Sequence, residues 1–472
     1  MFRTEMRSGS TILKGLTVWA ALAVAGTDIT VEGAAAGEEA VLRVAVFDVE
    51  VSPPVGSPLA YDPTKEILKP LSCRGVVLLG EEAPVVLCAV DWIGIGNAGQ
   101  TVFREALAAA VGTTPERVAV HAVHQHDAPH CDFSTEALLA EHGLEGRLFD
   151  AEFARTAIDR AARAAAEAVQ RARPVTHVGL GAGEVHEVAS NRRLLGPDGK
   201  VEQMRFTAGA TDPRNREAPV GTVDPLLRLV TLFDGEEPLV ALAYFASHPQ
   251  SFYRTGAANP DFPGLAREIR EEATGVTHVY FTGAGGNIGA GKWNDGSEPM
   301  RQVLAERLAD GMARAWEAME RTAVAAADLE WRYEPVELPL APHLDDEALA
   351  AVLADADAEI GVRMAAARDL AWVRRSAAGE PVLLGCLRLG PARILHMPGE
   401  LFVEYQLAAA AMRPDLFVAM AAYGDYAMGY IGTEVAYAEG GYETSPRASL
   451  VAPDVEAVLT AALERLLRVD AR

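Results

Sequence analysis

Residues 118–132, VAVHAVHQHDAPHCD, carry four of the chain's 11 histidines, at positions His121, His124, His126 and His130. Apolar and polar residues alternate at first, which predicts a strand whose side chains two residues apart share a face. His124 and His126 would then point the same way where the strand ends, with Asp127 placed to orient an imidazole from behind. Because neutral imidazoles are common metal ligands, this stretch predicts the start of a metal site. Strand-end histidines bonded only to backbone are the alternative reading of an HxH pair.

Size and charge limit the classes of function. The chain has 472 residues, half of them hydrophobic, which is enough to bury a large core. Its 42 basic and 66 acidic residues give a net charge of −24, so the surface repels nucleic acid and anionic lipid and favours a neutral or zwitterionic substrate. The four cysteines, Cys73, Cys88, Cys131 and Cys386, are too scattered for a disulfide scaffold or a thiolate zinc site, and we expect them to be mostly buried and free.

Residues 1–36 have the order of a secretory signal peptide. Basic residues precede an apolar run from Gly15 to Gly26, and small residues follow it. The run is shorter than the roughly 20 residues that a permanent membrane helix needs. We therefore expect export to the periplasm or the extracellular space, a mature domain at 37–472 and no transmembrane segment in it. An uncleaved N-terminal anchor is the alternative.

Three apolar hairpins are predicted at 75–94, 226–249 and 381–400. They end on Asp91, His248 and Glu400, while the strand of the opening stretch ends on His124. Helical periodicity predicts helices near 101–111, 150–173, 261–273, 298–320, 344–378 and 453–468. The fold class predicted is α/β, a mixed β-sheet core with flanking helices in one large domain.

Three polar features have two readings each. Asn191-Arg192-Arg193 could be solvated or paired with surface acids, or its guanidinium groups could face an oxyanion or carboxylate. The glycine-rich turn at 283–291 lacks the spacing of phosphate-binding loops, so we expect a close backbone approach to a substrate instead. The tyrosines at 423, 426, 430, 437 and 442 could form the edge of the core with their hydroxyl groups in water, or they could belong to a site.

The predicted helix at 344–378 has an apolar stripe, which we expect to lie in the core. It is formed by Leu349, Leu353, Ile360 and Met364.

His124, His248 and Glu400 form a set of two histidines and one carboxylate, each at a predicted strand end. Such a set is typical of catalytic zinc sites, which leave one position open for water. Zinc in such a site lowers the pKa of the water to about 7 and polarises a carbonyl. The residues alone therefore predict zinc-dependent hydrolysis.

The sequence also resembles the neutral/alkaline, non-lysosomal ceramidases, zinc amidases that cleave the N-acyl bond of ceramide. The resemblance spans roughly residues 42–468. It rests on short pieces in a shared order: HQHDAP at 124–129, SNRR at 190–193, FASHP at 245–249, the glycine-rich turn, PGELF at 398–402 and YIGTEVAYAEGGYE at 430–443.

The resemblance implies a site residue by residue. His124, His248, Glu400 and Tyr430 would bind zinc, and a metal can depress a phenol pKa from its ordinary value of about 10. Further implications concern catalysis: Arg192 and Tyr442 would hold the substrate carbonyl oxygen, and His126 would act as the acid and base. The implied reaction is hydrolysis of a small-molecule or lipid N-acyl amide by zinc-activated water.

Three differences separate this chain from the family pattern. Asp127 stands where the family's His-Thr-His-Ser-Gly-Pro motif has serine. Gly286-Asn287-Ile288-Gly289 stands where the family has Gly-Asp-x-Ser-Pro-Asn, and we expect no C-terminal immunoglobulin-like domain before Arg472. Ceramide itself is therefore open as the substrate. The alternatives are hydrolysis of small polar esters or amides, and a non-catalytic secreted binding protein that keeps the fold.

Overall fold

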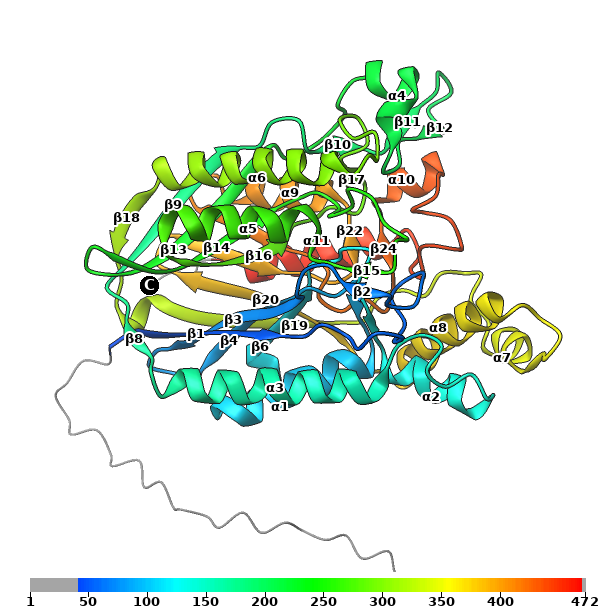
Figure 1. Cartoon of the computed structure of the whole chain (residues 1–472), viewed down its shortest axis with the longest axis horizontal. Coiled ribbons are helices and arrows are strands. Elements are labelled where there is room, and N and C mark those ends of the chain that lie inside the picture. The colour runs from blue at the N-terminus through cyan, green and yellow to red at the C-terminus, as the bar shows by residue number, and fades with distance from the viewer. Residues whose placement is uncertain (1–40, 469–472) are drawn as a thin grey trace, which may run out of the picture. The chain divides into compact units, whose positions relative to one another are not determined.

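The three predicted hairpins form the centres of three mixed β-sheets (Figure 1). The structure is a computed structural model that describes residues 41–468, so the predicted signal peptide lies outside the described residues. The strands of the first sheet, in the order β6-β4-β3-β1-β8, are β1 Arg43–Glu50, β3 Ser72–Leu79, β4 Val85–Val90, β6 Val118–Ala122 and β8 Arg173–Pro174.

The other two sheets have the same kind of antiparallel hairpin. The second, in the order β16-β14-β13-β9-β18, consists of β9 His177–Glu184, β13 Leu226–Asp234, β14 Glu237–Phe245, β16 Thr277–Thr282 and β18 Glu320–Ala323. The third, in the order β19-β20-β21-β23, consists of β19 Leu329–Val336, β20 Val382–Leu389, β21 Ala392–His396 and β23 Phe417–Ala421.

Helices cover the outer faces of these sheets, and short strand pairs connect their ends. The helices are α1 Ala98–Val111, α2 Phe133–Glu141, α3 Ala151–Val169, α4 Pro213–Glu217, α5 Asp261–Thr274, α6 Pro299–Glu317, α7 Asp346–Ala354, α8 Ile360–Ala377, α9 Val403–Met412, α10 Glu434–Glu439 and α11 Val455–Leu466. The short strands are β2 Glu66–Ile67, β5 Gly94–Ile95, β7 His130–Cys131, β10 Ser190–Asn191, β11 Arg193–Leu195, β12 Val201–Met204, β15 Ala257–Ala258, β17 Ile288–Gly289, β22 Glu400–Leu401 and β24 Tyr430–Ile431.

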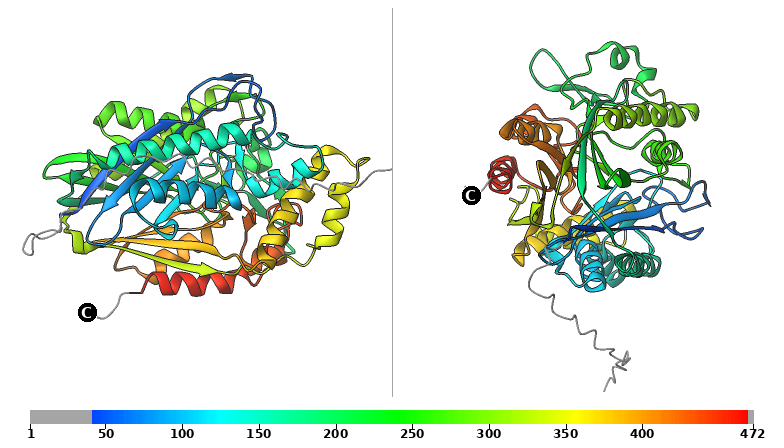
Figure 2. Two further views of the ribbon diagram at one scale, coloured as in Figure 1. Left: turned by 90° about the horizontal axis from the view of Figure 1, so that it is seen from below. Right: turned by 90° about the vertical axis from the view of Figure 1, so that its left-hand side faces the viewer.

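Each hairpin continues into the same kind of connection. A helix follows, and the chain then returns as a strand parallel to the second hairpin strand: β4–α1–β6, β14–α5–β16 and β21–α9–β23. Parallel neighbours need such a crossover, which puts a helix on one face of the sheet. In the three views α1 and α3 cover the first sheet, α5 and α6 the second, and α9 and α11 the third (Figure 2).

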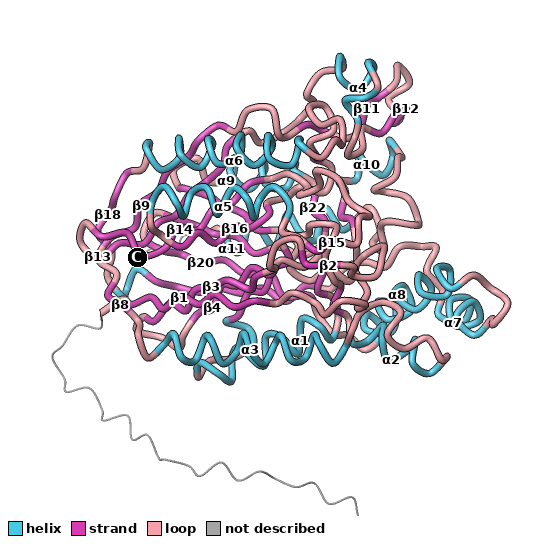
Figure 3. Tube along the Cα trace, viewed as in Figure 1, coloured by secondary structure: helices cyan, strands magenta, loops and turns pink. Residues whose placement is uncertain are grey.

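The carboxyl ends of the three returning strands meet. The backbone N–H of Ala122, the last residue of β6, donates to the carbonyl of Tyr423 at 2.9 Å, and that of Ala422, after β23, donates to the carbonyl of Thr282 at 2.9 Å. The hydroxyl of Thr282 in turn donates to the carbonyl of Val123 at 2.7 Å. Residues that follow these strands are therefore held together, among the loops that gather at one end of the sheets (Figure 3).

The core explains why the hairpin strands are apolar on both faces. In β4, Leu87 and Ala89 belong to the cluster shared by all three sheets. Val86, Cys88 and Val90 point the other way, into the cluster with α1 and α3. Alternate strand residues face opposite sides of a sheet, so a strand buried on both sides reads as a continuous apolar run. The predicted α/β class with a mixed sheet core is confirmed.

The predicted helix at 344–378 is wrong as a single element. The chain leaves α7 at Ala354 and begins α8 at Ile360, and Ile360, expected in the core, is 43% exposed. Between the helices the backbone N–H of Asp357 donates to the Asp355 carboxylate. Acidic side chains disfavour a helix C-terminus, and aspartate offers the backbone a competing turn.

The cysteines match the expectation, and no described helix resembles a membrane span. All four cysteines are buried and free, and the sulfur atoms of Cys73 and Cys88 lie 3.3 Å apart. Between residues 41 and 468 no helix is both long and apolar enough to cross a membrane.

Asp91, at the end of the first hairpin, is part of the core rather than of a site. Its carboxylate lies 2.7 Å from the guanidinium of Arg267 and accepts from the backbone N–H and the hydroxyl of Ser72, at 2.8 and 2.7 Å. Both charged side chains are at most 3% exposed. This ion pair therefore joins β3 and β4 of the first sheet to α5 of the second.

We expect Asp91→Ala to lower the free energy of unfolding by about 3–5 kcal/mol, because it leaves the Arg267 guanidinium buried without its acid. Equilibrium denaturation in urea measures the loss. Lys69→Ala is the matched control, since Lys69 and Glu268 form an exposed ion pair worth at most about 1 kcal/mol. A loss as small as that of the control would contradict a stabilising role for the buried pair.

Candidate metal centre and its cavity

Four of the predicted site residues converge at the strand ends. His124 follows β6, His248 follows β14, and Glu400 and Tyr430 are register partners in the β22–β24 pair. The Oε2 atom of Glu400 lies 3.3 Å from Nε2 of His124 and 2.9 Å from Nε2 of His248. The Tyr430 hydroxyl lies 3.3 Å from the same His248 nitrogen. Side chains from four separate segments thus meet at one point.

The backbone around these residues explains the convergence. His124 has φ 79°, a left-handed conformation that non-glycine residues adopt only where the surrounding structure requires it. Its N–H donates to the carbonyl of Trp92 at 2.9 Å, which ties it to the end of the neighbouring hairpin. The parallel pairing of β22 with β24 places Glu400 opposite Tyr430.

The hydrogen bonds of His124 and His248 fix which ring nitrogen carries the proton. Nδ1 of His124 lies 2.6 Å from the carbonyl of Ile93, and Nδ1 of His248 lies 2.6 Å from that of Gly285. A carbonyl only accepts, so each Nδ1 must be the protonated nitrogen. Burial lowers the pKa of His248 to about 4, so its ring is neutral and its Nε2 carries a lone pair.

The atoms that meet are therefore mostly acceptors. One proton between Glu400 and His248 would satisfy that pair, but the buried Nε2 of His124 would still have no donor, and it has none in the structure. The Arg192 Nη1 atom donates to His248 Nε2 and to the Tyr430 hydroxyl, at 3.3 and 3.2 Å, and thus compensates only part of the set. A cation between the four residues would satisfy them together.

The spacing also suits a metal ion. Ligand bonds of about 2.0–2.2 Å arranged as a tetrahedron put neighbouring ligand atoms about 3.3–3.6 Å apart. Three separations, Glu400 to His124, Glu400 to His248 and Tyr430 to His248, are 2.9–3.3 Å. The candidate ligand set, His124, His248, Glu400 and Tyr430, is therefore spaced close to what a small divalent cation requires.

His126 differs from the other two histidines. The nitrogen ligand atoms of His124, His126 and His248 lie within 4.8 Å of one another, so a three-histidine metal site is a geometric alternative. However, Nδ1 of His126 accepts from the Gln250 amide nitrogen at 3.1 Å and lies 2.9 Å from the Tyr61 hydroxyl. Burial also lowers its pKa well below the ordinary value. The neutral ring then carries its proton on Nε2, where it is a donor rather than a ligand.

The two adjacent arginines are buried, which excludes the solvated reading. The Glu443 carboxylate lies 3.3 Å from Nε of Arg192 and 3.3 Å from Nη1 of Arg193, and Arg193 also lies 3.2 Å from Glu439. Of the two arginines, Arg192 contacts the candidate ligand set.

Tyr442, the other residue predicted to hold the substrate oxygen, is partly exposed and packs edge-on against Tyr430 with ring centres 5.8 Å apart.

A cavity of about 390 Å³ opens beside this set. His124, His126, Glu400, Tyr430 and Tyr442 all lie in its wall. Neither Arg192 nor His248 lies in the wall, so the protein places them behind the exposed face of the set. The cavity therefore borders three of the four candidate ligands and the side chain of His126.

Several contacts at the site had no recognisable sequence motif. Tyr426 donates to Oε1 of Glu400 at 2.8 Å, and Tyr423 stacks on His124 with ring centres 4.5 Å apart. Both are among the five tyrosines between 423 and 442, and these contacts support the interpretation that the tyrosines belong to a site. Tyr61 and Gln250 lie in loops without a pattern around them, so only the fold reveals that they contact His126.

The predicted role of Asp127 is wrong. Its carboxylate accepts from the backbone N–H groups of Arg254 and Thr255, at 3.1 and 3.2 Å, and from the Thr255 hydroxyl at 2.6 Å. It therefore holds a loop and orients no imidazole. The carbonyls of Ile93 and Gly285 do that instead, and a carbonyl partner leaves no mark in the sequence.

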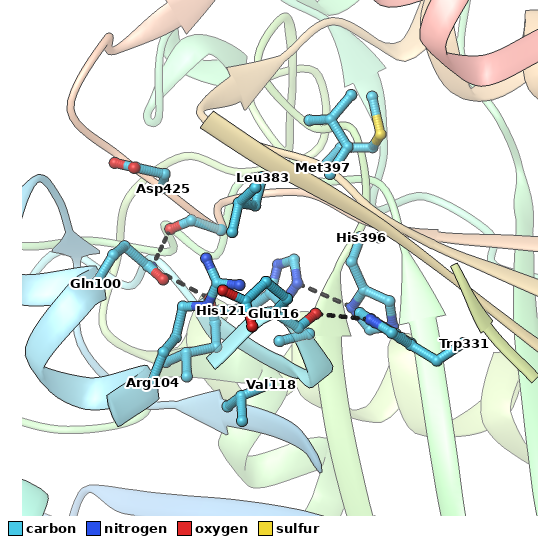
Figure 4. Close-up of a pocket in the computed structure, with 15 residues that line it drawn as sticks. Gln100, Arg104, Glu116, Val118, His121, Trp331, Leu383, His396, Met397 and Asp425 are labelled. Carbon is cyan, nitrogen blue, oxygen red and sulfur yellow. Dashed lines mark hydrogen bonds between the residues drawn. The ribbon is translucent and has the colours of Figure 1, made fainter. Parts of the chain in front are cut away.

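His121 also lies outside the site, whereas His130 lines the main cavity. The ring of His121 donates from Nδ1 to the carbonyl of Ala422 and accepts from His396 at 2.9 Å. The two rings border a separate cavity of about 30 Å³, room for about one water, together with Gln100, whose amide donates to the carbonyl of Gly424 (Figure 4). Alternation places His121 next to the strand end but on another face.

The glycine-rich turn approaches protein backbone rather than the cavity, contrary to expectation. A Cβ atom on Gly286 would lie 2.1 Å from the carbonyl oxygen of Glu400. Asn287 donates from its amide to Glu404 at 2.9 Å and accepts from the N–H of Val403 at 2.9 Å, at the start of α9. The turn therefore supports the strand that carries Glu400.

The fold is shared with solved ceramidases. The crystal structure of a neutral ceramidase from Pseudomonas aeruginosa matches with a TM-score of 0.63 and 19% identity, covering 92% of this chain and 76% of that one. A ceramidase complexed with C2 matches with a TM-score of 0.63 and 18% identity, covering 92% and 77%. No protein-family model and no curated protein matches the chain. The expected ceramidase-like fold is thus confirmed.

We expect Gly286→Ala to destabilise the protein by about 1–3 kcal/mol or more, because the added methyl group meets the Glu400 backbone, which cannot move without shifting β22. Gly289→Ala is the control in the same turn, since its nearest contact would be 3.6 Å from the Arg192 side chain. Urea denaturation compares the two variants. Equal stability would show that the turn does not constrain Glu400.

Proposed function

We propose that this chain is a zinc-dependent hydrolase that cleaves an N-acyl amide bond. The observation that carries the proposal is the meeting of two imidazole lone pairs, one carboxylate and one phenol beside an accessible cavity. The fold shared with ceramidases supports the class of reaction. The four donor atoms are two nitrogens and two oxygens, and a four-coordinate set of nitrogen and oxygen ligands suits zinc.

His124, His248, Glu400 and Tyr430 would hold the ion. When bound, zinc lowers the pKa of a water to about 7 and polarises a carbonyl oxygen. The protein orients these ligands in advance. Backbone carbonyls bind Nδ1 of both imidazoles, which leaves each Nε2 facing the other ligands, and the Tyr426 hydroxyl donates to Oε1 of Glu400 at 2.8 Å. Burial raises the pKa of Tyr430, and the adjacent Arg192 guanidinium opposes that shift and favours the phenolate.

His126 is the proposed acid and base. An amide nitrogen leaves readily only as an amine, so a group in the cavity must give it a proton. The Nε2 proton of His126 lies beside the candidate ligand set and has no other partner. The neutral ring would first take up the proton released as water attacks the carbonyl and become imidazolium, and it would then give its Nε2 proton to the leaving nitrogen and return to the neutral form. Tyr61 and Gln250 contact Nδ1 and keep it as the acceptor, so the proton stays on Nε2, the nitrogen beside the candidate ligand set.

Arg192 and Tyr442 are proposed to stabilise the carbonyl oxygen as it gains negative charge. The Tyr442 hydroxyl belongs to a side chain in the cavity wall, next to Tyr430. Arg192 adds a buried positive charge directly behind Tyr430. Loss of one such donor typically costs about 3 kcal/mol of transition-state stabilisation.

Substrate size and export are further parts of the proposal. The cavity lies at the low end of the range of about 300–1,000 Å³ typical of small-molecule sites, which favours a small amide or ester over a lipid with two long chains. Export rests on the signal-peptide pattern of residues 1–36.

We expect the purified protein to bind about one zinc per chain and to hydrolyse N-acyl amides, and chelation to abolish the activity. His124→Ala and Glu400→Gln should each lower zinc affinity at least tenfold, because each removes one of few ligands. Elemental analysis after dialysis and product release measure both effects. His186→Ala is the control, since that side chain is 59% exposed and does not line the main cavity. Unchanged zinc content and turnover in His124→Ala would contradict the proposal, and a metal-free protein that still binds a ligand would favour a binding protein.

We expect His126→Ala to keep its zinc but to lose about 10²–10⁴-fold in kcat on unactivated alkyl amides, because no acid then protonates the leaving nitrogen. Tyr61→Phe should lose about tenfold, since it removes one of the two contacts at Nδ1. Activated anilides and esters leave without that proton, so their losses should be smaller in both variants. Loss of zinc from His126→Ala would instead identify His126 as a third imidazole ligand.

A further inference from the structure

The volume of the main cavity limits the substrate. One water-sized atom occupies about 30 Å³, so the cavity of about 390 Å³ holds about 13 non-hydrogen atoms. Two long aliphatic chains exceed that number. A compact substrate that fills this space must also contact the wall beyond the candidate ligand set.

That part of the wall carries two arginines. One face of α8 lines the cavity with Gly361, Met364, Ala365 and Arg368, at the spacing of neighbours on a helix surface. Arg447 lines it from the segment after α10, and the Arg368 Nη2 atom donates to the Arg447 carbonyl at 3.4 Å. The two side chains therefore start from adjacent points of the wall.

Arg447 is the charge without a partner. Arg368 donates through Nε and Nη2 to Asp369, at 3.1 and 2.9 Å, which offsets much of its charge. Within residues 41–468, the Arg447 side chain makes no hydrogen bond or ion pair. Arg447 is exposed, so its guanidinium is both accessible and free to pair with an anion in the cavity.

The acids of the same wall are already engaged. Asp132 accepts from the N–H and the hydroxyl of Thr135 and from the amide of Asn97, at 2.8–3.0 Å. Glu400 belongs to the candidate ligand set and accepts from Tyr426. Away from the ligand set, the wall therefore carries two guanidinium groups and one carboxylate, Asp132, whose oxygens already accept hydrogen bonds.

We propose that the substrate is a small N-acyl amino acid, whose carboxylate binds Arg447 and the free Nη1 side of Arg368 while its amide lies at the candidate metal centre. This inference rests on the proposed function and names its substrate class. A guanidinium and a carboxylate form a charge-assisted pair with matched geometry. Salt screens the field of the distant acidic surface, so the local pair decides recognition.

The test uses hippurate and hippuramide, which have the same size and differ only in carboxylate against carboxamide. With zinc-loaded protein, benzoate release should show a KM for hippurate about fivefold to tenfold below that for hippuramide. Arg447→Ala should bring the two KM values together, and Arg447→Lys should restore part of the difference. Arg163→Ala is the matched control, an exposed arginine on α3 that forms no ion pair among the described residues.

Equal KM values for the two compounds in the unaltered protein, or an unchanged ratio in Arg447→Ala, would overturn the inference. Hydrolysis of a neutral amide such as N-octanoylethanolamine, with no turnover of hippurate, overturns the substrate class but leaves the proposed function intact. If no amide is hydrolysed, the proposed function fails, and calorimetric titration of the zinc-loaded protein with both compounds still decides whether the cavity prefers the carboxylate.

Discussion

The Glu400 carboxylate lies within 3.3 Å of Nε2 of both His124 and His248, and a carboxylate and imidazole lone pairs at such distances repel unless positive charge lies between them. This constraint explains most of the surrounding polar structure. The carbonyls of Ile93 and Gly285 turn the lone pairs of His124 and His248 inward, and Arg192 adds charge from behind. A cation bound between these atoms would compensate the unfavourable contacts.

The architecture brings the charges together through repetition. Three hairpins each continue through a helix into a parallel strand, and the ends of those strands are tied by direct hydrogen bonds. Loops at carboxyl ends of parallel strands are where open α/β sheets place their sites. The short β22–β24 pair then makes Glu400 and Tyr430 neighbours, although 29 residues lie between them in the sequence.

Much of the fold could be predicted from the sequence. Apolar runs interrupted by Asp234-Gly235 or Gly390-Pro391 predict hairpins because turn chemistry is local. The strand ends at His124, His248 and Glu400 followed from the same runs. By contrast, the sequence predicts α7 and α8 as one helix, because the helical spacing of apolar residues gives no sign of the turn that Asp355 stabilises. Asp127, Tyr61 and Gln250 depend on contacts across more than 60 residues, which no local pattern encodes.

Anomalous diffraction from crystals of the zinc-loaded protein, measured on both sides of the zinc absorption edge, tests the central claim most directly. We expect one peak within about 2.0–2.2 Å of Nε2 of His124 and His248, of the Glu400 carboxylate and of the Tyr430 hydroxyl, with the His126 ring outside bonding distance. A peak bonded to all three imidazoles, or no peak between the four residues, would contradict the assignment.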